Sequence, residues 1–190
     1  MSASIENAAK IWTETELEAL PEDGYIHEVV SGELVMSPKN NWEHGEICAR
    51  LLTAMKTFAD AHRLGAVWDS SSGFWMANRN CRAPDVSFVR KERLLELKRL
   101  PPGFFKGAPD LAVEILAPSL TRRDLDERLK DFFSSGTQLA WLIDPSAQRV
   151  EICRSLIQRR LLGPDGVLDG EQVLPGFQYR VVDLFKEWEW

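Results

Sequence analysis

The 190-residue chain lacks several features that would assign it to a class at once. It has no apolar run approaching the roughly 20 residues of a membrane-spanning helix, and no basic start followed by an apolar block, so we expect neither a membrane segment nor a signal peptide. Cysteines are few and widely separated: Cys48, Cys81 and Cys153 show no C-x-x-C spacing. This pattern favours reduced thiols in the core of a cytoplasmic protein over disulfides or metal ligands.

Positive charge is also scarce, because 23 Lys and Arg residues stand against 29 Asp and Glu residues. The net charge of −6 excludes a surface that attracts nucleic acid as a whole, so any such binding needs a local basic patch or a bound cation. A hydrophobic content of 44% is that of an ordinary globular protein, and the length suits one domain with a sizeable core.

Hydrophobic periodicity and turn residues predict the order of the elements. We expect residues 1–12 to form a flexible leader and residues 13–190 a single domain. Within it the pattern predicts a short helix capped by Thr13, a hairpin around Ser31-Gly32, a long helix that Gly65 ends, and two strands within 66–89. A buried strand, a helix, another buried strand and a meander follow. This order indicates one α/β domain with a mixed central sheet flanked by helices, and with Trp141 and Trp188 in the core.

One acid stands in an apolar strand. The stretch "DLAVEILAPS", residues 110–119, has the composition of a strand buried on both faces, yet Glu114 lies in its middle. An ionised carboxylate in that setting costs several kcal/mol, by order of magnitude, unless something compensates for it. A partly exposed edge position or an ion pair with an arginine is the plain alternative to a functional site.

A second acid could share an ion with Glu114. Asp110 is four positions away on the same strand, roughly 13 Å at about 3.3 Å per residue, which is too far. Asp85, at the start of the strand "RAPDVSFV", can lie beside Glu114 because adjacent strands are about 5 Å apart. Two such carboxylates are stable together only if one is protonated or a cation separates them. Oxygen ligands without a Cys or His pattern favour Mg²⁺ or Mn²⁺.

Other polar residues allow more than one interpretation. Glu28 lies on an apolar face of the predicted hairpin, as a further acid of the site or as half of a salt bridge. His44, in the first turn of the long helix, is a cap, a packed residue or a member of the site. The basic runs, including "RNCR" at 79–82, have the pattern of solvated faces.

Three segments, "PDVSFV", "PDLAVEILAPS" and "FFSSGTQLAWLIDP", together resemble the PD-(D/E)XK nuclease superfamily, and most closely its Uma-type, restriction-endonuclease-like branch. The resemblance extends from about Thr13 to Phe185. It implies a restriction-endonuclease-like fold and metal-dependent hydrolysis of phosphodiester bonds in DNA by a homodimer. It further implies metal ligands at Asp85, Glu114 and the backbone carbonyl of Ile115, and a catalytic role for Glu28.

The chain departs from that pattern at one position. The superfamily has a lysine two residues after the second acid, where this chain has Leu116. The branch carries its lysine on the next helix, and the matching position here is Arg128, with Lys130 as the alternative. About 200° of helix rotation separates these two residues, so they cannot both face the site. Two classes therefore stay open: a metal-dependent endonuclease, and a weakened or inactive nuclease-fold module that binds nucleic acid or protein.

Overall fold

The structure is a computed structural model that describes residues 10–38, 40–97, 99, 102–117 and 120–188. Residues 1–9 of the expected leader lie outside these ranges. Its last residue, Trp12, donates its backbone N–H to the carbonyl of Gly32 at 2.8 Å. None of the helices within the described ranges is long and apolar enough to cross a membrane.

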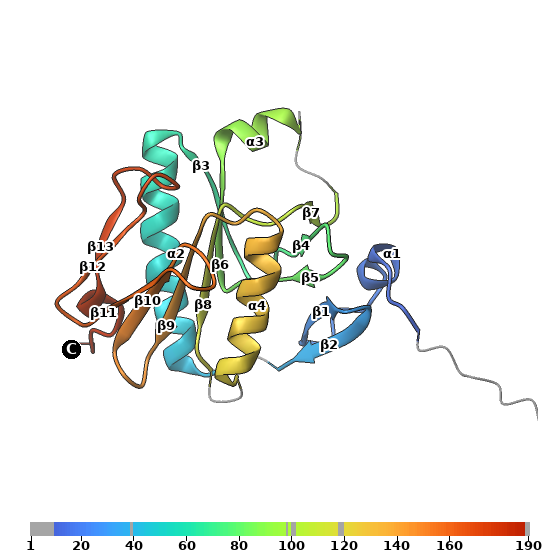
Figure 1. Cartoon of the computed structure of the whole chain (residues 1–190), viewed down its shortest axis with the longest axis horizontal. Helices are drawn as coiled ribbons and strands as arrows, with labels where there is room; N and C mark the ends of the chain where they lie inside the picture. The colour runs from blue at the N-terminus through green and yellow to red at the C-terminus, as the bar shows by residue number, and fades with distance from the viewer. Residues whose placement is uncertain (1–9, 39, 98, 100–101, 118–119, 189–190) are drawn as a thin grey trace, which may run out of the picture.

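A mixed six-stranded sheet forms the centre of the fold, as the sequence predicted (Figure 1). Its strand order is β11-β10-β9-β8-β6-β3. Strands β8 and β9 run parallel, whereas β6 lies antiparallel to β8 on the other side. The strands are β3 (Gly65–Asp69), β6 (Val86–Arg90), β8 (Leu111–Ile115), β9 (Leu139–Asp144), β10 (Arg149–Cys153) and β11 (Arg159–Leu162).

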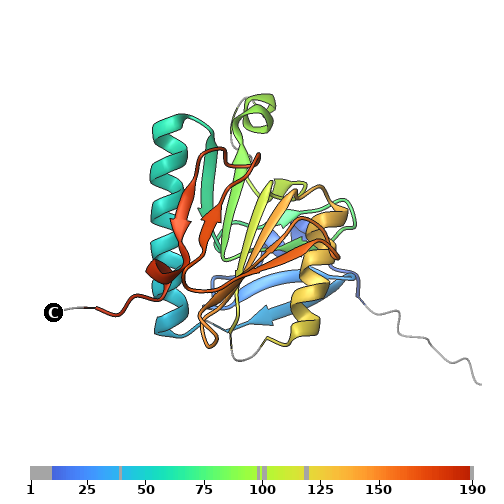
Figure 2. The same ribbon diagram turned by 60° about the vertical axis from the view of Figure 1, so that its left-hand side comes forward.

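Two helices cover the opposite faces of this sheet (Figure 2). Helix α2 (Trp42–His62) buries the predicted stripe that includes Leu51 and Met55, and helix α4 (Arg122–Ser134) buries Leu125, Leu129 and Phe132 on the other face. The predicted end of α2 was two residues late. Arg63 adopts the left-handed conformation that ends the helix, and Gly65 already opens β3.

A second sheet of five strands lies beside the central one, in the order β2-β1-β5-β4-β7. The hairpin predicted at Ser31-Gly32 is confirmed, with both residues at positive φ. The prediction of two strands within 66–89 was wrong, because the chain there forms four. Two of the four are short strands of the second sheet, separated by a turn in which the N–H of Met76 donates to the carbonyl of Asn80. The five strands are β1 (Ile26–Val30), β2 (Glu33–Ser37), β4 (Phe74–Trp75), β5 (Cys81–Arg82) and β7 (Phe105–Lys106).

The remaining elements are short: α1 (Glu14–Glu18), α3 (Lys91–Glu96), β12 (Val167–Asp169), β13 (Gln178–Arg180) and α5 (Val181–Leu184). Trp141 is fully buried, as expected, and all three cysteines are free thiols, two of them buried. Trp188 is 58% exposed, so its expected place in the core was wrong. The chain after α5 passes the N-terminal part of α2, where the indole N–H of Trp188 donates to Glu46.

Candidate active site at the end of strand β8

Glu114 lies on the face of the central sheet that helix α4 covers. Its neighbours Val113 and Ile115 belong to the core beneath α2, while Ala112 packs with the residues of α4. Because successive side chains of a strand point to opposite faces, Glu114 points to the α4 side. It is 3% exposed, so the plain alternative of a partly exposed edge position is excluded.

Asp85 lies directly before β6, beside the end of β8. The paired part of the two strands ends at Val86 opposite Val113. Beyond it, the Asp85 side chain takes the place of a backbone acceptor, because its Oδ2 accepts the N–H of Ile115 at 2.7 Å. The same oxygen lies 3.2 Å from Nε2 of His44, which reaches it from the first turn of α2. His44 is therefore a member of this cluster, where the sequence had left its role open.

The backbone of Ile115 faces the same edge as Asp85. The next residue, Leu116, donates its N–H in the opposite direction, to Ile143 on β9. In a strand the N–H and C=O of one residue point to the same edge, and those of the next residue to the other edge. The carbonyl of Ile115 is thus directed toward the β6 edge of β8, where Asp85 lies.

Arg128 reaches two buried acids, Glu28 and Glu114, from α4. Its Nη1 donates to Oε2 of Glu28 at 2.6 Å, and its Nη2 donates to the carbonyl of Ala83 at 3.3 Å. Its Nε lies 2.9 Å from Oε1 of Glu114, but the two are not aligned for a hydrogen bond. Lys130 is exposed, so of the two basic positions that the sequence offered, the fold brings Arg128 to the acids.

The electrostatic state of Glu114 reflects this incomplete pairing. Burial raises the pKa of Glu114 to about 8, and the negative charges of Asp85 and Glu28 act in the same direction against the opposing effect of Arg128. Within the described part of the chain, its Oε1 has no hydrogen-bond partner. This oxygen faces the guanidinium of Arg128, so the acid has a charge partner but no aligned hydrogen bond, and its pKa is shifted as in many functional sites.

A small cavity joins these side chains. Its volume is about 50 Å³, enough for a few water molecules. Wider hollows exist elsewhere, such as an open groove of about 740 Å³ along α2, but no carboxylate lies among that groove's lining residues. Three acids, Glu28, Asp85 and Glu114, line the small cavity together, and its other lining residues are Ile26, Ser37, Pro38, Asn40, His44, Ala83, Leu120 and Arg128.

A family model for Uma2, described as a putative restriction endonuclease, matches residues 14–183. This chain belongs to the Uma2 family. The crystal structure of a putative nuclease belonging to DUF820 from Anabaena variabilis has the same fold, with a TM-score of 0.79. It is 23% identical in sequence, over 92% of this chain and 97% of that chain. A search of curated proteins gave no match.

Two features of this Uma2 chain were missed by sequence reasoning. Arg82 was placed on a solvated face, but it is buried, and it binds Asp131 of α4 through its Nε and Nη2 at 2.8 and 2.7 Å. The expectation failed because β5 lies between two strands of the second sheet. A signal for Asp131 did exist, since its spacing of three from Arg128 places both on one flank of the buried stripe of α4.

The Uma2 cavity can hold a hard cation with few protein ligands. No three His, Cys, Asp or Glu side chains among the described residues converge as a ready metal cluster. Asp85 and Glu114 both line the small cavity, and the carbonyl of Ile115 faces the edge of β8 where Asp85 lies. Mg²⁺ usually takes one or two carboxylates and keeps several waters or substrate oxygens, so this donor set fits it.

Proposed function

We propose that the chain is an endonuclease that hydrolyses phosphodiester bonds in DNA and depends on Mg²⁺ or Mn²⁺. Membership of the Uma2 family supports the reaction class. The observation that supports the metal is the state of Glu114: it is buried beside a second acid, its pKa is raised to about 8, and one of its oxygens receives no hydrogen bond from the residues described, only the misaligned contact with Arg128. A divalent cation removes the cost of ionising that side chain.

Each residue has a defined task in this proposal. Asp85, Glu114 and the carbonyl of Ile115 hold the ion, which when bound supplies Lewis acidity and a more acidic water. The hydrogen bond from the Ile115 N–H fixes the Asp85 carboxylate, and His44 contacts the same oxygen. Arg128 binds a phosphate oxygen and stabilises the charge that develops there. It cannot serve as a base, because an arginine does not lose its proton in a protein.

A second candidate has its own supporting observation. Arg128 already contacts Glu28 at 2.6 Å and Glu114 at 2.9 Å, so one guanidinium partly neutralises both acids without any metal. This is the arrangement that an inactive nuclease-fold module would use to remain stable while it binds nucleic acid or protein.

Cleavage by wild type and by the Glu114→Gln, Arg128→Ala and Arg128→Lys variants separates the two candidates. The endonuclease predicts that wild type cleaves DNA in Mg²⁺ or Mn²⁺, that Glu114→Gln does not, and that Arg128→Ala loses about 10²–10³ in rate because a charge-stabilising donor is gone. If Arg128 is a weaker stand-in for the family's lysine, Arg128→Lys raises the rate. Cleavage no faster than that of Glu114→Gln, together with no heat of Mn²⁺ binding, would identify the inactive module.

We further propose that the enzyme is a homodimer, by analogy with nucleases of this fold that cut both strands with two single-site subunits. Light scattering measures this directly. A mass of twice 21.6 kDa supports the dimer, and a mass of 21.6 kDa that persists when DNA is added rules it out.

A further inference from the structure

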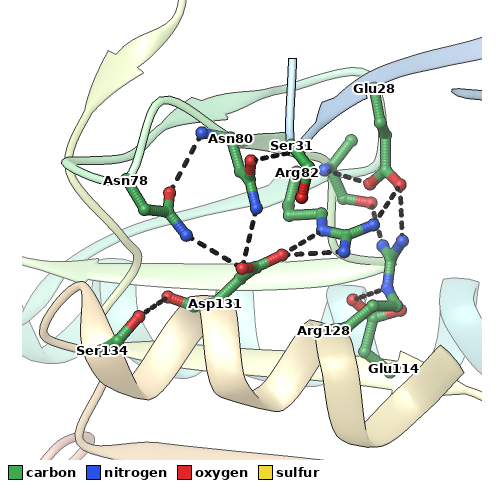
Figure 3. Close-up of polar contacts among 10 residues, drawn as sticks. Glu28, Ser31, Asn78, Asn80, Arg82, Glu114, Arg128, Asp131 and Ser134 are labelled. Carbon is green, nitrogen blue, oxygen red and sulfur yellow. Dashed lines mark hydrogen bonds and ion pairs between the residues drawn. The ribbon is translucent and has the colours of Figure 1, made fainter. Parts of the chain in front are cut away.

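Five charged side chains form a continuous buried chain of alternating sign (Figure 3). It runs from Asp131 to Arg82, then to Glu28, then to Arg128, and ends at Glu114. Both Asp131 and Arg128 belong to α4, three residues apart, whereas Arg82 and Glu28 belong to the second sheet. The ion pairs therefore connect two residues of α4, about one helical turn apart, through two residues of the second sheet.

The second sheet holds the middle of this chain firmly. Glu28 accepts the N–H of Ala83 at 2.8 Å through Oε1 and contacts Arg82 and Arg128 through Oε2. Burial opposes its ionisation, but the two arginines outweigh this effect and lower the pKa of Glu28. At the far end, Asp131 accepts hydrogen bonds from the side-chain amides of Asn78 and Asn80 at 2.9 and 2.8 Å.

The two acids next to Arg128 differ in how they hold it. Glu28 accepts a well-formed hydrogen bond of 2.6 Å, and the carbonyl of Ala83 accepts another. The contact with Glu114 is a close approach of charges without hydrogen-bond geometry. The orientation of the guanidinium is therefore set from the side of Glu28, and one oxygen of Glu114 receives no hydrogen bond from the described part of the chain.

We infer that Glu28, Arg82 and Asp131 are positioning residues for Arg128. Together they fix its guanidinium beside Glu114 in the orientation that a phosphate oxygen of the substrate would meet. This role for Glu28 replaces the catalytic role that the family resemblance implied. The positioning concerns the geometry of the free protein, and its consequence for phosphate binding rests on the proposed nuclease function.

The first experiment measures the orientation of Arg128 without any activity. The Nε–H proton of a buried, held arginine exchanges slowly with water, and nuclear magnetic resonance follows it in ¹⁵N-labelled protein. We expect this exchange to become at least about 10-fold faster in Asp131→Asn and Glu28→Gln, because a network member that loses its charge frees its neighbours. The matched control is Asp126→Asn on the same helix, whose residue pairs with Arg122 and Arg159 outside the network.

If the Nε–H proton of Arg128 exchanges at the wild-type rate in Asp131→Asn and Glu28→Gln as it does in the control, the positioning role is overturned, whatever the cleavage assay shows. If Asp131→Asn lowers the melting temperature too far to be measured, Arg82→Lys tests the same link, since it keeps the charge but loses the two-point contact with Asp131.

The second experiment tests the consequence for cleavage. In the wild-type background we expect Asp131→Asn to lower the single-turnover rate about 10- to 100-fold, which is the effect of a small misplacement near the reacting atoms. In the Arg128→Ala background the same change should alter the rate less than about 2-fold, because there is no guanidinium left to position. The loss of melting temperature should be equal in both backgrounds.

A purely structural role for Asp131 predicts equal rate losses in both backgrounds, and this result would overturn the inference. If the exchange experiment gives the expected result and no variant, including wild type, cleaves DNA, then the positioning stands and the proposed nuclease function is wrong.

Discussion

The two ends of strand β8 carry buried acids in contrasting states. Asp110, directly before the strand, is 1% exposed and is fully paired. Its carboxylate accepts the backbone N–H of Arg90 at 2.8 Å and contacts the side chains of Arg90 and Arg93. Glu114, four residues along, is 3% exposed, and one of its oxygens has no hydrogen bond from the residues described.

The difference shows that burial of an acid does not by itself mark a functional site. Both residues follow the same pattern in the sequence, an acid next to apolar strand residues. Asp110 is a structural residue because its partners match its oxygens, so it joins β8 to β6 and α3. Glu114 lies beside a second acid and an imperfectly aligned arginine, and its charge lowers the stability of the fold unless a ligand is present.

The largest expected difference between the two ends concerns folding. Asp110→Ala should lower the free energy of unfolding by about 3 kcal/mol, since it leaves two arginines and one N–H without their partner. The arginine side chains are about one third exposed, 34% and 31%, which keeps the loss near the low end of the range for buried pairs. At about pH 5, where the folded protein keeps Glu114 protonated, Glu114→Gln should change the free energy of unfolding by less than about 1 kcal/mol. Urea denaturation measures both, and equal losses would remove the distinction.

Metal binding should depend more on Glu114 than on Asp110, the reverse of their effects on folding. We expect Glu114→Gln to weaken Mn²⁺ binding by on the order of 10²-fold or more, because loss of even an outer-shell partner costs 10- to 100-fold. Asp110→Asn, in protein whose circular dichroism is unchanged, should bind Mn²⁺ within about 3-fold of wild type. Isothermal titration calorimetry gives both affinities. Comparable weakening by the two substitutions would mean that the ion is not held at Glu114.

A third expected effect, of a different kind, is a pH dependence of stability carried by Glu114 alone. Its pKa is about 8 in the folded protein and has the ordinary value of 4.5 in the unfolded chain, so the folded state binds the extra proton between these values. Stability should therefore fall as pH rises from about 5 to about 8, by up to about 1.4 kcal/mol per pH unit. Wild type and Glu114→Gln should be compared in a chelator. Parallel curves would contradict the raised pKa.

The sequence predicted the elements better than their connections. The mixed sheet and the two flanking helices followed from apolar periodicity, which is a local property, whereas the choice of Asp85 as the partner of Glu114 rested also on the family resemblance. The second sheet was missed, because two-residue strands such as β4 and β5 carry no periodicity to detect.

The candidate site was predictable only in part for a related reason. Glu114 was found because it is an exception within the apolar run of β8. Arg82 and Asp131 were missed because their burial depends on a contact between segments 49 residues apart, between a short strand and a helix flank. No local pattern indicates which arginine will be covered by such a contact.

The hydrogen bond between Asp85 and the N–H of Ile115 has a consequence for how such a chain would change under mutation. Without the Asp85 carboxylate the buried N–H of Ile115 would lose its acceptor, at a cost of about 1–3 kcal/mol. A lineage that lost the activity would still retain Asp85 for folding. Glu114, whose charge weakens the fold, would be replaced early by a neutral residue. If the endonuclease proposal holds, survival of Glu114 among descendants of this chain would report a working site, and survival of Asp85 would report only a folded one.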